Sequence, residues 1–367
     1  MGETKPRFDR NSPEARALID EIVHGTFMKE GTMAAFPTCF PGASIPFPAD
    51  ESHITALAIS GDGMVYGGTS GRTAHVFVGM FHGVTGMIFD RGAVAGATSC
   101  VAICCGRSRF VACLNGPAGG QIVGGAFSPL PFDLIQEWGF RRPPLDLLGK
   151  VDGERIIHAV ADDSRTSLIG ITTAHLFTVD IDRCRIDVRD ELPAAGRIAV
   201  GSKGGIFGRD GPAHLWRFDV PSRKLQRRAV KLPDGRWDNH PLTWGRSRQT
   251  GLLYTADAEG NLFSFDEDHA FSAALGRTLL APVGPMAVTH DGRVFGFCGA
   301  EMAKMFCYNP AARQVSNLGV AVSVLERRRY GYVFGDAVTG RDGQIYFGED
   351  DDLGHLWIYF PKIVPSA

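Results

Sequence analysis

The sequence contains no long apolar run and no large excess of charge. None of its apolar stretches reaches the roughly 20 residues that a helix needs to span a bilayer. Its 38 Lys and Arg residues nearly balance 40 Asp and Glu residues, so no overall positive charge favours nucleic acid or an anionic membrane as a partner. Residues 1–22 are polar and lack the apolar core of a signal peptide. We therefore expect a cytoplasmic protein, although a secreted chain trimmed of its signal would look the same.

The signatures of several enzyme classes are also missing. The eight cysteines form no CxxC pair, and no GxSxG, HExxH, Walker or dinucleotide-binding motif occurs in a fitting context. Cys100, Cys113 and Cys298 lie in apolar, strand-like runs, so we expect reduced and buried thiols. Helical periodicity is almost absent after residue 30, and the one helix that we expect covers 13–25.

What the sequence does contain is one short phrase repeated seven times. Each copy has a small residue, then often His or another polar residue, then apolar and aromatic positions. The copies are AHVF at 74–77, GGQIV at 119–123, AHLF at 174–177, AHLW at 213–216, GNLF at 260–263, AKMF at 303–306 and GHLW at 354–357. Each lies in a unit of four short β-like runs separated by glycine-rich turns. Repeats of this length with four strands predict an all-β, seven-bladed β-propeller.

The seventh unit lacks its outermost strand, and the strand-like segment 33–40 has no blade of its own. Placing 33–40 at the outside of the last blade would close the ring and leave no open edge between its ends. We therefore predict an N-terminal extension with the helix over 1–32 and a single propeller domain over 33–367. In the second blade, the outer strand is expected within 131–140. A pair of β-sandwiches is the competing architecture, but it would not explain seven similar units.

Histidines recur at one end of the predicted ring. In a propeller the starts of the innermost and third strands of every blade meet at the same mouth. The histidines expected at this rim are His53, His158 and His240 at innermost strands, and His75, His175, His214 and His355 at third strands. The sequence leaves two interpretations open: a binding or catalytic cluster, or a repeated packing device in which each His bonds to a neighbouring blade.

Closure of the ring brings the last blade beside the first. Tyr330 and Tyr332 then fall near His53, and the acidic run 349–352 reaches the same rim. The run would bind Ca²⁺ or form a solvated turn, and it lacks a defined ligand spacing. Arg209 is a further cation that would reach an anionic ligand at the mouth.

With these residues in view, the chain resembles the seven-bladed propeller polysaccharide lyases, such as the ulvan lyases and rhamnose–glucuronate lyases. The more specific stretches are 53–77 and 330–361. The resemblance implies β-elimination, in which a His and a Tyr remove the proton α to a uronate carboxylate. It gives His53 and His75 as the histidines and Tyr332, or Tyr330, as the tyrosine. An Arg or a divalent metal, Ca²⁺ or Zn²⁺, would neutralise the carboxylate, but no cofactor is certain.

The leading hypothesis is therefore a carbon–oxygen lyase that acts on an acidic oligosaccharide or polysaccharide. Its expected catalytic residues are His53, His75 and Tyr332. The expected substrate-binding residues are Tyr330, Arg209, His175, His214, His240 and His355. The first alternative is a non-catalytic propeller that binds a protein or glycan, and the second is a metal-dependent hydrolase of the lactonase kind. The sequence indicates neither the metal nor the oligomeric state.

Overall fold

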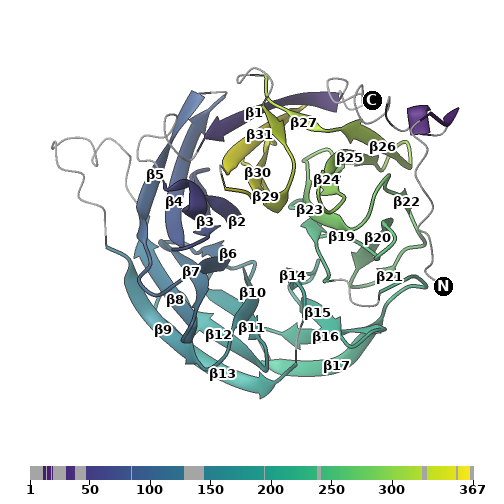
Figure 1. The fold of residues 1–367 in the computed structure, drawn as a ribbon. Coiled ribbons are helices and arrows are strands. Elements are labelled where there is room, and N and C mark those ends of the chain that lie inside the picture. The colour runs from purple at the N-terminus through teal and green to yellow at the C-terminus, as the bar shows by residue number, and fades with distance from the viewer. Residues whose placement is uncertain are drawn as a thin grey trace, which may run out of the picture.

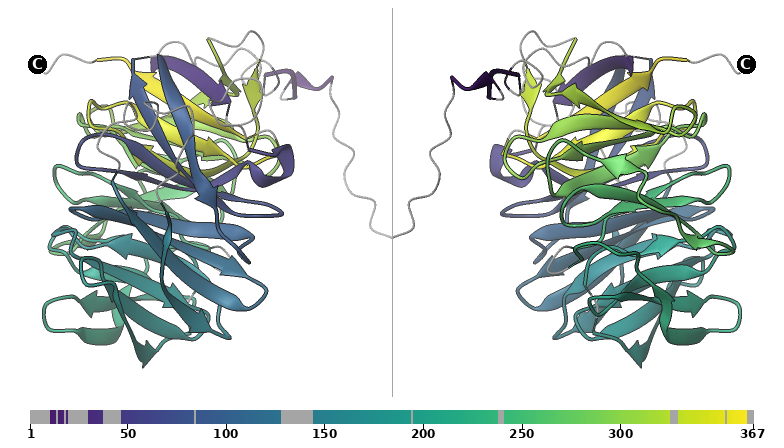
Figure 2. Two further views of the ribbon diagram at one scale, coloured as in Figure 1. Left: turned by 90° about the vertical axis from the view of Figure 1, so that its left-hand side faces the viewer. Right: turned by 90° about the vertical axis from the view of Figure 1, so that its right-hand side faces the viewer.

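The computed structural model has a ring of seven antiparallel blades in the described part of the chain, which confirms the propeller (Figure 1). The described residues are 11–13, 15–17, 19, 30–37, 47–83, 85–127, 144–193, 195–237, 241–324, 329–352 and 354–363. Figure 2 shows the same ring from two edges. No helix in these ranges is long and apolar enough to cross a membrane.

Four strands in chain order, from the axis outward, make each of the first four blades. Blade one is β2 (His53–Ile59), β3 (Val65–Ser70), β4 (His75–His82) and β5 (Thr85–Ala93). Blade two is β6 (Ser99–Cys105), β7 (Arg109–Gly116), β8 (Gly119–Ala126) and β9 (Asp146–Asp152). Blade three is β10 (Ile156–Ala161), β11 (Ser167–Thr172), β12 (His175–Asp180) and β13 (Arg185–Glu191). Blade four is β14 (Ala199–Val200), β15 (Ile206–Asp210), β16 (His214–Asp219) and β17 (Lys224–Lys231).

The remaining blades complete the ring, with short additional elements. Blade five is β18 (Gly245–Arg246), β19 (Leu253–Ala256) and β20 (Asn261–Asp266), edged by β21 (Ala270–Phe271) and β22 (Gly276–Arg277). Blade six is β23 (Val283–Val288), β24 (Val294–Cys298), β25 (Lys304–Asn309) and β26 (Gln314–Gly319). A two-stranded ribbon, β27 (Ala321–Val322) and β28 (Tyr330–Gly331), leads to β29 (Phe334–Thr339), β30 (Ile345–Glu349) and β31 (His355–Pro361) of blade seven.

The N-terminal strand closes the ring as predicted. Strand β1 (Gly31–Pro37) pairs antiparallel with β31, from Gly31 opposite Pro361 to Pro37 opposite His355. It is therefore the outermost strand of blade seven, where the first strand of the chain lies beside the last one (Figure 1). Its observed start lies at Gly31 and not at residue 33, and residues 38–40 of the predicted strand lie outside the described part.

The prediction for the outer strand of blade two was wrong. We expected it within 131–140, but the fourth strand is β9, Asp146–Asp152, which pairs with β8. The segment 131–140 itself lies outside the described residues. We predicted a strand there because the segment is rich in apolar residues. The observed strand β9 contains Lys150 and two aspartates, because an outermost strand has one face toward solvent. Of the predicted N-terminal helix, residues 13, 15–17 and 19 belong to the described part, and all of them are helical.

A cross-strand contact explains the repeated phrase. In four of the seven copies the aromatic residue lies opposite a glycine of the preceding strand, as in Phe77 opposite Gly67 and Trp216 opposite Gly208. A Cβ built on Gly67 would lie 2.0 Å from Phe77 Cζ, and one on Gly208 would lie 2.3 Å from Trp216 Cζ2. The aromatic side chain therefore lies over the glycine and is completely buried. Close packing thus requires the glycine and the aromatic residue together.

The cysteines fit the same packing. In the described part, Cys100, Cys104, Cys105, Cys113, Cys298 and Cys307 are buried, and all are free thiols. Burial raises the pKa of Cys104 to about 12, so these groups are unreactive, small apolar side chains.

Candidate functional site

At the rim where the innermost strands begin, His53 links blades one and seven. Its Nδ1 lies 3.0 Å from Asp350 Oδ1 and its Nε2 lies 3.0 Å from Asp352 Oδ1. Partial burial alone would lower the pKa of His53, but the hydrogen bonds to Asp352 and Asp350 outweigh it and the pKa is raised. His53 is thus favoured as an imidazolium that donates from both nitrogens.

His75 has its own pair of carboxylates. Its Nε2 lies 2.8 Å from Glu51 Oε2 and its Nδ1 lies 3.2 Å from Asp90 Oδ1, and all three residues are buried. Burial opposes the charge, but the bonds to Asp90 and Glu51 raise the pKa of His75 overall. The two histidines predicted to act together are therefore each held by a separate set of acids.

The other third-strand histidines repeat this arrangement in part. His175 Nδ1 lies 2.7 Å from Glu154 Oε1. His355 Nδ1 lies 3.0 Å from Glu349 Oε2 and 2.9 Å from Arg329 Nη2. His214 has no side-chain hydrogen bond to any residue in the described ranges. Glu51 and Glu154 both stand two residues ahead of an innermost strand, so this acid–histidine contact is a repeated connection between strands.

The remaining predicted residues have other partners than His53 and His75 among the contacts of the described residues. Tyr330 and Tyr332 are 42% and 40% exposed, and their rings stack with centroids 6.5 Å apart. The carbonyl of Tyr332 accepts a hydrogen bond from the N–H of Ala303 in blade six. Arg209 donates to the carbonyls of Gly211 and Trp237. His240 lies outside the described residues.

The acidic run offers no metal site in the part of the chain that the structure describes. There, no three His, Cys, Asp or Glu side chains are grouped to hold a metal ion. Glu349 Oε2 accepts from Arg329 Nη2 at 2.8 Å, and Asp350 and Asp352 flank His53. Glu349, Asp350 and Asp352 are thus bound to Arg329 and His53, whereas a Ca²⁺ ion would need these carboxylates as ligands.

A cavity of about 460 Å³ occupies the centre of the ring. Its walls come from the innermost strands of blades one, two, three, four, five and seven, which surround the axis in Figure 1. This volume lies in the range of small-molecule sites. The cavity reaches the turns between first and second strands, at the end of the ring opposite the histidine rim.

At the end of the cavity nearer the histidine rim, an arginine forms an ion pair across the central channel. Arg197, ahead of blade four, pairs with Asp336 of blade seven, on the opposite side of the ring (Figure 1). Its Nη2 also donates to the carbonyl of Gly335 at 2.5 Å. The second oxygen of Asp336 accepts from the N–H of Leu57 in blade one, at 2.7 Å. This bridge joins three blades and forms one end of the cavity.

His158 lines the cavity beside this bridge. Burial lowers its pKa well below the usual value, and the charge of Arg197 lowers it further. His158 is therefore neutral, and its Nδ1 accepts a hydrogen bond from the N–H of Ile198 at 3.3 Å.

Three arginines gather at the cavity end near the turns: Arg165, Arg246 and Arg248. Arg246 makes a forked ion pair with Asp163, with N–O distances of 2.9 and 3.1 Å. The guanidinium groups of Arg165 and Arg248 have no hydrogen bond or ion pair with any residue in the described ranges. Partial loss of hydration lowers the pKa of Arg248, although the residue as a whole is exposed, and the charges of Arg165 and Arg246 lower it further. The three arginines therefore form a cluster of positive charges, and the N–H groups of two of them have no acceptor in the described part of the chain.

The backbone of Arg165 adds a second sign of function. The turns of blades one, four, six and seven place a glycine with positive φ at their fourth position: Gly63, Gly204, Gly292 and Gly343. Blade three has Arg165 there, with φ of 57°. A side chain in this region costs about 1 kcal/mol or more. Because Arg223, Arg228 and Arg313 share this conformation elsewhere, the strain is informative only together with the place of Arg165 at the cavity.

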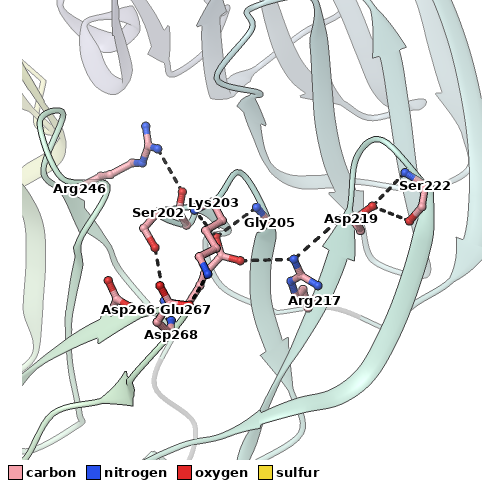
Figure 3. A network of polar contacts seen from close by, with 11 residues as sticks. Ser202, Lys203, Gly205, Arg217, Asp219, Ser222, Arg246, Asp266, Glu267 and Asp268 are labelled. Atoms are coloured by element: carbon pink, nitrogen blue, oxygen red, sulfur yellow. Dashed lines mark hydrogen bonds and ion pairs between the residues drawn. The ribbon is translucent and has the colours of Figure 1, made fainter.

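The neighbouring turn is braced from blade five (Figure 3). Glu267 Oε1 accepts from the N–H groups of Lys203 and Gly205, at 2.7 and 3.3 Å. Its other oxygen lies 3.4 Å from Arg217 Nη2, and its side chain is only 4% exposed. The same turn presents the carbonyl of Gly201, which accepts from Arg246 Nη2 at 3.1 Å. Glu267 thus fixes the backbone that positions Arg246.

The sequence reasoning missed this end of the ring because it followed the histidines. A signal was present: six of the seven turns between first and second strands carry a basic residue. These residues are Arg107, Arg165, Lys203, Arg248, Arg293 and Arg341. Aligning the turns would also have shown an arginine where four blades have glycine.

Comparisons with known proteins give the fold. No family model and no curated protein matches the sequence. The chain is similar in structure to the extracellular domain named for the hybrid two-component system BT4673 from B. thetaiotaomicron, with TM-score 0.57 and 12% identity over 89% of this chain and 39% of that one. A second structure, named for the one-component system BT4673, has TM-score 0.55 and 10% identity over 88% of this chain and 39% of that one. The likeness supports a propeller and does not extend to a lyase family.

Proposed function

We propose that the protein binds a small acidic molecule in the central cavity, through Arg165, Arg246 and Arg248. The observation that carries this proposal is that Arg165 and Arg248 lie beside a cavity large enough for a ligand, with no partner for their guanidinium groups among the described residues. Guanidinium groups bind carboxylates and phosphates by paired hydrogen bonds.

The charges around the cavity support an anion. Four arginines and three aspartates line it. Asp336 and Asp163 are paired with Arg197 and Arg246. Asp162 accepts from the N–H groups of Thr166 and Ser167 within its own turn. Positive charge is therefore left over at the cavity end that carries Arg165 and Arg248.

Binding is favoured over turnover by the state of the rim. The elimination that the family resemblance implies needs a base with a free lone pair. His53 and His75 each direct both nitrogens at carboxylates and have raised pKa values, which favours imidazolium groups. Lyase activity on a uronate saccharide stays a prediction, as does the lactonase alternative. An acidic saccharide remains a candidate ligand for the cavity.

The test is titration calorimetry with a panel of acids: glucuronate, its oligomers, simple hydroxy acids and inorganic phosphate. We expect one of these acids to bind, and Arg248→Ala to weaken it about 10-fold or more, because a charge-assisted hydrogen bond contributes about 1.5–3 kcal/mol. Arg165→Gly should weaken binding similarly while leaving the fold at least as stable, because glycine relieves the positive φ.

The matched control is Arg183→Ala, which removes an arginine from an exposed turn and should leave affinity unchanged. If no acid binds, or if both arginine variants bind as tightly as the parent, the proposal fails. Formation of an unsaturated uronate in the same samples would restore the lyase hypothesis.

A further inference from the structure

The walls of the central cavity offer few neutral groups that can recognise a ligand. Its lining side chains in the described part are aliphatic residues, cysteines, charged residues, His158 and Trp244, with no Ser, Thr, Asn, Gln or Tyr among them. Trp244 already donates its Nε1–H to the carbonyl of Arg197, at 3.0 Å. His158 is thus the neutral side chain with a strong hydrogen-bond donor to spare.

The direction of that donor follows from the backbone. Ile198 N–H can only donate, so Nδ1 of His158 must be the acceptor in their contact. A neutral imidazole with an accepting Nδ1 carries its proton on Nε2. Nε2 has no hydrogen bond to any residue in the described ranges. His158 is half-buried and lines the cavity, so a ligand oxygen in the cavity would accept from this donor in place of water.

The acceptor must also suit its neighbours. Arg197 is already paired with Asp336, next to His158. A second carboxylate placed there would meet the negative charge of Asp336 and find no unpaired cation. A hydroxyl or carbonyl oxygen would accept from His158 without this repulsion.

We infer that His158 is a specificity-determining residue, and that the ligand is a hydroxy, oxo or sugar acid. Its acid group binds the arginines, and a neutral oxygen further along the molecule accepts from His158 Nε2–H. This inference rests on the proposed function, because the arginines orient the ligand. It distinguishes such acids from plain aliphatic monoacids and from diacids.

The experiment compares three matched acids that differ only at the far end: a terminal ketone or hydroxyl, a methyl group and a carboxylate. In the parent protein we expect the oxygen-bearing acid to bind about 10-fold more tightly than the other two. His158→Leu should remove this preference. His158→Gln keeps an amide donor and should restore part of it. Arg248→Ala should weaken all three acids together and leave their ratios intact.

Thermal unfolding of each variant shows whether it is folded, since His158→Leu leaves the N–H of Ile198 without its acceptor. If the parent binds all three acids equally, or if His158→Leu keeps the preference, the inference is wrong although the arginine site stands. If none of the three acids binds and Arg248→Ala has no effect on any acid in the panel, the proposed function itself fails.

Discussion

His75 shows what a buried histidine between two acids does for the fold. It lies between Glu51 and Asp90, with all three side chains removed from water. Burying three ionisable groups is favourable only while their charges compensate. The same repeat position in blade four holds His214, which has no side-chain hydrogen bond within the described ranges. The two positions therefore form a matched pair for experiment.

We predict that His75→Ala lowers the free energy of unfolding by about 3 kcal/mol near pH 6, because two buried carboxylates lose the imidazolium between them and Glu51 keeps only its pair with Arg72. The folded-state pKa of His75 is raised, so its contribution is complete below the unfolded pKa of about 6.5 and is lost as pH rises through the folded value. The gap between parent and variant should shrink at higher pH. Urea unfolding at several pH values measures it.

His214→Ala is the control and should cost much less at every pH. A cost for His75→Ala that is small, or that grows with rising pH, would contradict the assignment of His75 as a charged structural group.

At this scale the sequence located the histidines but not their partners. The partners of His75 come from a segment ahead of β2 and from β5, and those of His53 from the loop after β30. Such contacts depend on the closed ring and on side-chain directions, which periodicity does not encode. The arginine cluster differs, because its turns carried a visible signal, but Arg165 and Arg248 lie on different blades and only the closed ring places both at one cavity.

Among the elements, the turn 201–205 depends on a side chain from the next blade. Glu267 accepts two of its N–H groups and is almost fully buried. We predict that Glu267→Ala lowers the free energy of unfolding by about 2 kcal/mol, because the N–H groups of Lys203 and Gly205 lose a charged acceptor and Arg217 keeps only Asp219. Ligand affinity should fall as well, since the turn holds Arg246. Urea unfolding and calorimetry on one variant test both effects.

Asp268→Ala is the matched control, because Asp268 is exposed and pairs with Lys203 at the surface. It should change stability by no more than about 0.5 kcal/mol. Equal effects of the two variants would show that the turn does not rely on Glu267.

Strand prediction succeeded where the pattern was local. The glycine and aromatic pair of second and third strands lies within one hairpin, so its spacing can be read from the sequence. The outer strands were harder: β9 is partly exposed and follows residues outside the described part. An edge strand with a solvated face has a weaker pattern than a buried one.

For the whole molecule, closure of the ring was predictable because the seventh unit lacked a strand and the N-terminal segment supplied one that belonged to no blade. What the sequence did not indicate was the bridge across the channel. Arg197 and Asp336 are separated by 139 positions, and only the circular arrangement brings them together. The ring is therefore held both at its perimeter, by β1, and across its centre.

The perimeter contact can be tested at Met33 in β1. Met33 is completely buried and belongs to the apolar cluster between blades six and seven, with Trp357 and Tyr359. We predict that Met33→Ala lowers the free energy of unfolding by about 2–5 kcal/mol, through lost burial and the cavity left behind. Thr32→Ala, on the exposed side of the same strand, should cost about 0.5 kcal/mol or less.

Because β1 joins the two ends of the ring, urea should unfold Met33→Ala as one cooperative unit. The midpoint of unfolding should shift while the slope stays unchanged. An unshifted midpoint would show that closure by β1 does not stabilise the ring, and a shallower slope would show that blade seven unfolds separately.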